Sequence, residues 1–314
     1  MGYELNIVAA KKKVDKSFRE ASETSSSFEL QKYLRERKSI IDEALEQHLK
    51  RKDAQVSPLL YEAMCYGVLD AGKRFRPILT LMVGELFGAK RAPLLSFACA
   101  IELIHCYSLI HDDLPALDND DFRRGKPSCH KQFGEAIALL AGDALLTEAF
   151  FVAADPALAR ALGADLSARL IREISQAAGI RGMISGQSRE FELGDGKITQ
   201  NILEDLDRLK TGALITTSAR LGAMIGRAGR KELERITRYA NALGLAFQIT
   251  DDILDANEIS KDKGAANYLT VTGEAGARER VQRLYEECIK ELDPWGDAAE
   301  PLREIARYVT ERTQ

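Results

Sequence analysis

The chain has 314 residues, of which 45% are hydrophobic and 29% charged, and its formal net charge is −4. A globular composition without a basic surplus is not that of a typical nucleic-acid binder, and no run of about 18 apolar residues indicates a membrane span. The five cysteines include no CxxC pair, so we expect free, mostly buried thiols in a protein of the reducing cytoplasm.

Apolar residues recur with helical spacing, at i, i+3, i+4 and i+7, along most of the chain. This spacing predicts helices over residues 28–50, 57–71, 75–88, 92–113, 131–153, 158–178, 200–226, 231–258, 276–292 and 298–312. The 92–113 and 231–254 segments are apolar nearly all round, so we expect buried helices there. Alternating strand patterns are missing. The sequence therefore predicts an all-α fold, with one domain at 27–314 and a poorly ordered extension at 1–26.

Two of these helices end in an aspartate pair, in "LIHDDLPALD" and, about 140 residues later, in "FQITDDILD". One such pair alone is more often a solvated helix end. Two copies, each followed by a further aspartate, favour a metal site, because clustered carboxylates repel one another unless a cation intervenes. Their oxygens suit Mg²⁺, which also accepts phosphate oxygens. The candidate ligands are Asp112, Asp113, Asp118, Asp251, Asp252 and Asp255.

Several short stretches of the sequence carry basic residues that could bind phosphate. "AGKRFRP" places cations at the start of a helix, where backbone amides also favour anions, and the arginines of "FRRGKP" have planar forks that suit phosphate. Each group also has a plainer explanation: a surface patch, neutralisation of neighbouring aspartates or, for His105, a satisfied core position. Beside two candidate metal sites, however, they suit a ligand with two diphosphates: Lys73, Arg76, His105, Arg123, Arg124, Lys210 and Thr211.

The segments "GKRFRP", "LIHDDLPALDNDDFRRGKP", "KTGALI" and "FQITDDILD" together resemble the signature segments of the trans-isoprenyl diphosphate synthases. The match runs in order from about residue 28 to the C-terminus, and bacterial farnesyl-type members are nearest, with geranylgeranyl-type members next. This resemblance implies a single large bundle of antiparallel helices around a deep central cavity, usually in a homodimer. It also implies condensation of isopentenyl diphosphate with an allylic diphosphate, with three Mg²⁺ ions in each substrate-bound site.

The resemblance further implies a role for each matching residue. The first metal-binding motif is matched by Asp112 and Asp118, with Asp113 assisting, and the second by Asp251, Asp252 and Asp255. Contacts to the allylic diphosphate are implied for Arg123, Lys210 and Gln248. Thr211 is implied to stabilise developing cationic character. The isopentenyl diphosphate pocket is implied at Gly72, Lys73, Arg76, His105 and Arg124.

The sequence departs from the family pattern after the second aspartate pair. Family members have a longer loop there, ending in a lysine three residues before a tyrosine. If Tyr268 is that tyrosine, the lysine position holds Ala265, so the allylic contact is either made by Lys261 or Lys263 or missing. In "GQSREF", Glu190 stands where the family usually has aspartate.

Product length is the least constrained part of the functional prediction. Tyr107 stands five residues before Asp112, roughly 7 Å along the helix, and Ser108 follows it. A ring at Tyr107 that blocks the growing chain favours a C15 product, and a C20 product is the alternative. The ring could instead serve only in packing. A terpene cyclase, a non-catalytic partner subunit and a diphosphate hydrolase are the rival functions. Lys73, Arg76 and His105 argue against a cyclase, the two intact aspartate motifs against a silent subunit, and the apolar pocket against a hydrolase.

Overall fold

The computed structural model describes residues 28–50, 57–69, 72–193, 198–255 and 267–312. These residues are helical apart from loops and one short antiparallel hairpin, in which β1 (Phe122–Arg123) pairs with β2 (Lys126–Pro127). The helices are α2 (Leu30–Leu49), α3 (Pro58–Val68), α4 (Phe75–Leu86), α5 (Arg91–Asp112), α6 (Cys129–Phe133), α7 (Glu135–Ala153), α8 (Pro156–Leu162), α9 (Ala164–Ala178), α10 (Met183–Leu193), α11 (Gln200–Asp207), the π-helical turn η2 (Arg208–Gly212), α12 (Ala213–Ile225), α13 (Arg230–Asp255), α14 (Tyr268–Leu292), the 3₁₀ helix η3 (Asp293–Ala299) and α15 (Glu300–Glu311). The all-α prediction is confirmed.

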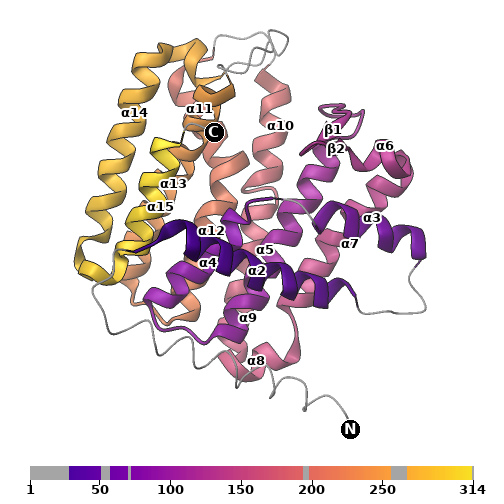
Figure 1. The fold of residues 1–314 in the computed structure, drawn as a ribbon, viewed down its shortest axis with the longest axis horizontal. Helices are drawn as coiled ribbons and strands as arrows, with labels where there is room; N and C mark the ends of the chain where they lie inside the picture. The colour runs from indigo at the N-terminus through magenta and orange to yellow at the C-terminus, as the bar shows by residue number, and fades with distance from the viewer. Residues whose placement is uncertain (1–27, 51–56, 70–71, 194–197, 256–266, 313–314) are drawn as a thin grey trace.

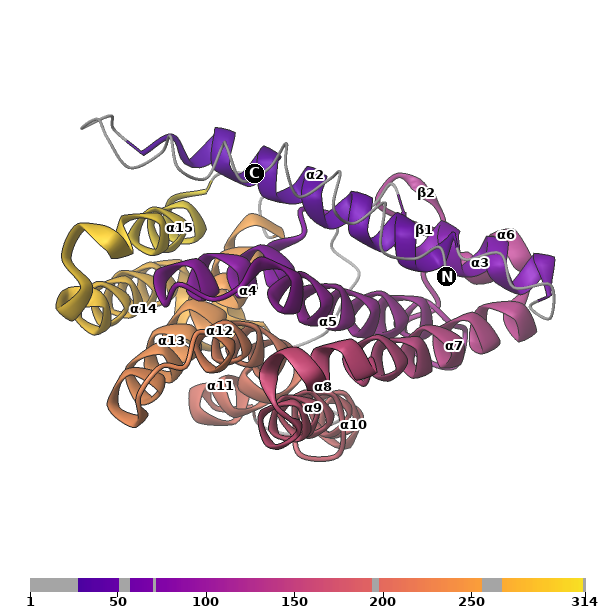
Figure 2. The same cartoon turned by 90° about the horizontal axis from the view of Figure 1, so that it is seen from below.

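Helix α5 lies at the centre of the bundle (Figure 1), packed between α4 and α7 and against α12. Helices α13, α14 and α15 form a second group that meets the first through α12. In the view of Figure 2, α2 and α3 lie along one side, over α4, α5 and α7. The predicted burial of the 92–113 segment is confirmed, because thirteen of the side chains of α5 are buried.

Helix boundaries follow from local chemistry that apolar spacing alone does not reveal. Asp155 caps α8 by accepting a hydrogen bond from the Ala157 amide, and Pro156 occupies the first helical position. Asn267 and Thr270 form a reciprocal capping box that starts α14. That start lies eight residues before the predicted one, because a kink at Gly273 (φ +71°) interrupts the apolar spacing.

Two glycines divide segments that were predicted as continuous helices. Gly134 (φ +83°) separates α6 from α7, and Gly163 (φ +90°) separates α8 from α9. Only glycine adopts such backbone angles readily. Helix α10 was not predicted at all, because its sequence "MISGQSREFEL" is polar and buries only two residues.

Two helices, α5 and α7, are long and apolar enough to cross a membrane by length and composition alone, which is weak evidence for a span. Most of α5 is buried in the bundle, as expected for a core helix. In α7 only 39% of the apolar window is buried, and Leu139, Leu140 and Phe151 are exposed on it. We interpret α5 as core and α7 as a helix with one apolar face left uncovered by the described chain.

Candidate active site

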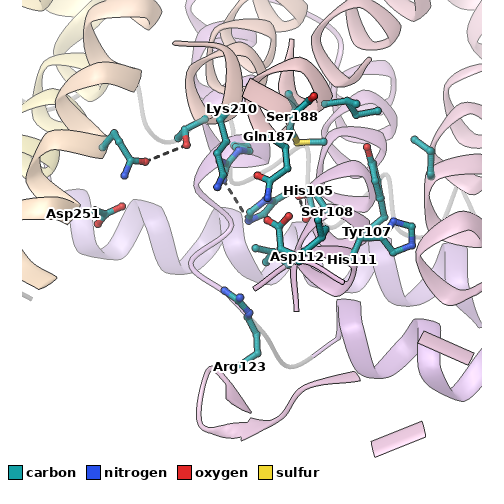
Figure 3. A pocket seen from close by; sticks show the side chains of 18 of the residues that line it. His105, Tyr107, Ser108, His111, Asp112, Arg123, Gln187, Ser188, Lys210 and Asp251 are labelled. Carbon is teal, nitrogen blue, oxygen red and sulfur yellow. Dashed lines mark hydrogen bonds between the residues drawn. The ribbon is translucent and has the colours of Figure 1, made fainter. Parts of the chain in front are cut away.

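A cavity of about 770 Å³ lies between α5, α7, α10, η2 and α13. Figure 3 shows Asp251 on one side of it, Asp112 near the middle, and Tyr107 and His111 on the other side. Most of the residues predicted from the sequence line this one space: Arg76, His105, Tyr107, Ser108, Asp112, Arg123, Arg124, Lys210, Thr211, Gln248 and Asp251. The described fold thus brings together side chains that are up to 175 positions apart in the sequence.

The first aspartate pair stands where α5 ends. Asp112 lines the cavity, and burial raises the pKa of its carboxyl group to about 6. Asp113 is 2% exposed and points away from that space, where it accepts hydrogen bonds from Nε of Arg123, at 2.8 Å, and from a terminal nitrogen of the same guanidinium. The pair therefore splits into one carboxylate at the cavity and one that fixes the hairpin arginine.

The loop after α5 turns back on the helix end. The Asp118 amide donates to the Asp112 carbonyl at 2.8 Å, but the Asp118 side chain is exposed outside the cavity. Asp120 lies 3.3 Å from a guanidinium nitrogen of Arg123, whereas Asp121 pairs with Lys131 at 2.7 Å. Asp120 thus partly neutralises Arg123, whereas Asp121 pairs with Lys131 instead.

The second aspartate pair stands in the last two turns of α13. Asp251 lines the cavity, and burial raises the pKa of its carboxyl group to about 6. Asp252 is held by protein groups: it accepts hydrogen bonds from the Gln248 side-chain amide at 3.1 Å and from the Tyr268 backbone amide at 2.8 Å. Asp255, the last residue of α13, is exposed.

Arg76 and His105 meet at the inner wall of the cavity. A guanidinium nitrogen of Arg76 lies 3.4 Å from Nε2 of His105. Burial, reinforced by the positive charge of Arg76, holds the pKa of His105 well below its usual value, so the ring is neutral at pH 7. A neutral imidazole can donate to an anion without adding charge. Lys73, by contrast, is exposed and does not line the cavity.

Gly72 (φ +100°) precedes these residues and packs against Arg124. A Cβ atom at Gly72 would lie 2.8 Å from a guanidinium nitrogen of Arg124. A side chain here would both strain the backbone and displace the arginine. The stretch before α4 therefore reaches the cavity through the contact of Gly72 with Arg124, and α4 itself through Arg76 in its first turn.

The π-helical turn η2 carries Lys210 and Thr211 into the cavity. Lys210 forms an ion pair with Glu190 of α10, and the Thr211 hydroxyl donates to the Gln248 side-chain oxygen at 3.1 Å. Turns of this kind inside helical segments occur often at functional sites. Gly186 of α10 allows the close approach, because a Cβ atom there would lie 2.4 Å from the Lys210 backbone nitrogen.

The wall farthest from Asp251 in Figure 3 is formed around Tyr107. Its side chain is 5% exposed and packs edge-on against the His111 ring, with the ring centroids 5.6 Å apart. Burial raises the pKa of Tyr107 to about 12. Apolar side chains of α7 and α10 continue the lining: Leu146, Met183, Ile184 and Phe191.

Asp143 of α7 lines the cavity and had not been singled out from the sequence, and neither had Arg312 and Asp207. Arg312, directly after α15, contacts Asp251. Asp207, directly before η2, is 9% exposed, and burial, together with the charge of Asp252, raises its pKa to about 8. Neither has a sequence signal, since each contact depends on tertiary packing. Residues 1–26, Lys261, Lys263 and Ala265 fall outside the described residues.

The donor set fits a hard divalent cation that shares its coordination with a ligand. Within the described ranges, no three His, Cys, Asp or Glu side chains lie close enough to hold a metal ion by themselves. Mg²⁺ usually takes one or two carboxylates and completes its shell with water and phosphate oxygens. Asp112 and Asp251, which line one cavity together with four cationic side chains, match that requirement.

Comparisons with known proteins agree with this arrangement. Residues 57–267 match the protein family described as polyprenyl synthetase. The chain is 42% identical to a farnesyl diphosphate synthase of Geobacillus stearothermophilus over 263 residues, covering 80% of this chain and 87% of that protein. It is 37% identical over 304 residues to large subunit 1 of a chloroplastic heterodimeric geranylgeranyl pyrophosphate synthase of Arabidopsis thaliana, covering 91% and 80%. The crystal structure of a geranyltransferase from Legionella pneumophila superposes with a TM-score of 0.84 at 33% identity, covering 90% of this chain and 98% of that one.

Proposed function

This chain belongs to the polyprenyl synthetase family, and from that premise we propose that it is a short-chain trans-prenyltransferase. It condenses isopentenyl diphosphate with dimethylallyl or geranyl diphosphate and yields mainly farnesyl diphosphate. The alternative product is geranylgeranyl diphosphate, which the similarity to the Arabidopsis relative keeps open. The catalytic domain comprises residues 27–314, and residues 1–26 are an extension.

One observation carries the proposal: Asp112 and Asp251, one from each aspartate pair, and four cationic side chains line a single cavity that continues between largely apolar walls. Diphosphates need cations, and an allylic chain needs an apolar space. The far wall is formed mainly by Tyr107 and by apolar side chains of α7 and α10, with His111 and Asp143 as polar members of the lining.

The residues divide between two substrates. Lys210, Arg123 and Gln248 hold the allylic diphosphate, and their positive charge and donors stabilise the charge that develops on it as the carbon–oxygen bond breaks. Arg76, His105 and Arg124, with Gly72 and the exposed Lys73 at the rim, hold isopentenyl diphosphate. Its C4 alkene carbon attacks the allylic carbon, and the departing pyrophosphate takes the proton that is then lost. The apolar walls keep water from the cationic centre.

Mg²⁺ is the cofactor in this proposal, with three ions in each substrate-bound site. Asp112 and Asp251 would hold it at the cavity, and Asp113, Asp118, Asp252 and Asp255 are the further ligands that the sequence predicts. When bound, Mg²⁺ neutralises the diphosphate and lowers the barrier to its departure. Asp113 and Asp252 assist by fixing Arg123 and Gln248, their hydrogen-bond partners.

The test is elongation by the purified protein. Radiolabelled isopentenyl diphosphate is incubated with dimethylallyl, geranyl or farnesyl diphosphate, with Mg²⁺ or with a chelator, and the products are separated by chain length. We expect Mg²⁺-dependent C15 formation from the two shorter primers and little extension of the C15 primer. No elongation with any primer would refute the proposed function, and C20 from the shortest primer would replace the product by the alternative.

We further propose that the enzyme is a cytoplasmic homodimer that pairs through the apolar face of α7. Leu140 and Phe151 are 51% and 63% exposed on this face, and exposed apolar patches of this kind mark interfaces. Sedimentation velocity of the wild type should show a dimer, and Leu140→Lys combined with Phe151→Lys should shift it toward the monomer. A monomeric wild type, or an unaffected dimer in the double variant, would contradict this arrangement.

A further inference from the structure

The C-terminal arginine of the described chain reaches across to the second aspartate motif. Arg312 follows α15 and stands 61 positions after Asp251 in the sequence. One of its terminal nitrogens donates both to the Asp251 carboxylate and, at 2.9 Å, to the Phe247 carbonyl. The guanidinium also lies flat over the Phe247 ring, 4.2 Å from its centroid. Three groups of α13 thus hold Arg312, the last described residue, at the rim of the cavity.

The contact between Arg312 and Asp251 is not an exposed surface ion pair. The Arg312 side chain is only 6% exposed, and its Nε is buried without a hydrogen-bond partner among the described residues. Burying a guanidinium donor without an acceptor is unfavourable. An unsatisfied donor beside a cavity that is lined for diphosphates indicates that an oxygen of a ligand completes its hydrogen bonding.

Asp251 is also the carboxylate that the proposed function assigns to a divalent cation. Arg312 donates to only one oxygen of this carboxylate, Oδ1, but a cation bound at either oxygen would be repelled by the guanidinium at such short range. Arg312 therefore competes with a cation for the charge of Asp251. The planar fork of an arginine matches phosphate as well as carboxylate, and Phe247, on which Arg312 stacks, lines the cavity.

We propose that Arg312 is an exchangeable counter-ion of Asp251: a divalent cation displaces it, and the released guanidinium binds the diphosphate that arrives with the cation. The inference rests on the proposed function. Its consequence is an order of binding. The cation alone binds weakly because it must break the Arg312 contact without compensation. The cation together with a diphosphate binds well because Arg312 gains a new anionic partner.

The experiment measures Mn²⁺ binding by electron paramagnetic resonance, with and without inorganic pyrophosphate. Arg312→Gln should bind Mn²⁺ alone about tenfold more tightly than the wild type, because one charge-assisted contact no longer competes. With pyrophosphate present, that gain should disappear or reverse. Arg307→Gln is the matched control, since Arg307 is on α15, is exposed and pairs with Glu304 away from the cavity, and it should behave as the wild type.

The outcomes separate this inference from the proposed function. If Arg312→Gln, shown to be folded by circular dichroism, binds Mn²⁺ alone no more tightly than the wild type, Arg312 is only a structural anchor and the inference is overturned. The same holds if Asp251→Asn leaves Mn²⁺ binding unchanged. Elongation by the wild type is tested independently, so a failure there refutes the proposed function while the Mn²⁺ measurements still decide the role of Arg312.

Discussion

Replacing Glu102 by glutamine should weaken both the fold and the binding of isopentenyl diphosphate. Glu102 is 1% exposed in α5, and its Oε1 accepts a hydrogen bond from Arg74 at 2.7 Å. Arg74 also donates to Asp42 at 2.7 Å and to the Val68 carbonyl at 2.6 Å. Its backbone is left-handed (φ +53°), immediately before α4. This buried network therefore fixes the unusual turn that leads into Arg76.

The magnitude follows from what glutamine keeps and loses. Its amide oxygen still accepts from Arg74, but the buried guanidinium loses a full counter-charge and retains only Asp42, whose side chain is 34% exposed. Removing one partner of a buried pair outright costs about 3–5 kcal/mol, and a neutral hydrogen bond recovers about 1 kcal/mol of that. We expect the free energy of unfolding to fall by about 2–4 kcal/mol, seen as a fall in Tm of roughly 5–10 °C by circular dichroism.

The functional effect should be selective. Arg76 follows Arg74 by two residues, and His105 stands one turn after Glu102 on α5, so a shift between α4 and α5 separates these two side chains. We expect the KM for isopentenyl diphosphate to rise about tenfold, equivalent to about 1.4 kcal/mol, while the KM for geranyl diphosphate changes little. Glu279→Gln, in an exposed helical ion pair with Arg283, is the control and should change neither property. A stability loss that leaves the isopentenyl diphosphate KM unchanged would refute the positioning role.

Tyr107→Ala should lengthen the product beyond C15, because it removes the buried ring at the far wall of the cavity; chromatography of the dephosphorylated alcohols measures this, and unchanged products would show that the ring only packs. The pKa of Asp207 rises from 3.8 to about 8 on burial, so between these values the folded state holds a proton that the unfolded state has lost, and stability falls as the pH rises. Asp207→Asn stays neutral and should be about 2–4 kcal/mol more stable than the wild type at pH 8 but similar near pH 4 in urea titrations; an equal difference at both pH values would contradict the assignment. Gly186→Ala should lower the free energy of unfolding by about 1–3 kcal/mol and also lower kcat, because its Cβ would lie 2.4 Å from the Lys210 backbone nitrogen. Thermal melts and steady-state rates that match the wild type would disprove the close packing of α10 on η2.

The sequence predicted the helices with long apolar stripes and missed those defined by other signals. α5 and α13 were found within a few residues of their bounds, because their apolar residues recur over more than five turns. α10 carries no comparable stripe, since it buries only Met183 and Gly186. The hairpin at 122–127 is too short for an alternating pattern, and it forms where Arg124 (φ +54°) and Gly125 (φ +77°) allow a tight turn.

The candidate site was predictable to the extent that its residues lie in compact motifs. Asp112, Arg123, Lys210 and Asp251 stand in short acidic or basic stretches that suggest phosphate and metal chemistry only in combination, and the fold places all four at one cavity. Arg312 was not predictable in the same way. Its significance arises from a contact between the end of α15 and α13, and no local pattern distinguishes it from the exposed arginines on the same helix.

The two aspartate pairs share the same arrangement, with one aspartate at the cavity and the other bonded to protein groups. In each, the first aspartate faces the cavity and has a pKa raised by burial to about 6, at Asp112 and Asp251. In each, the second is held by the protein: Asp113 by Arg123, and Asp252 by Gln248 and the Tyr268 amide. Adjacent residues on a helix point about 100° apart, so a helix that presents one carboxylate to the cavity can turn its neighbour toward the protein. In the proposed function, a doubled aspartate at each helix end would supply one cation ligand together with an anchor for the neighbouring side chain, Arg123 or Gln248.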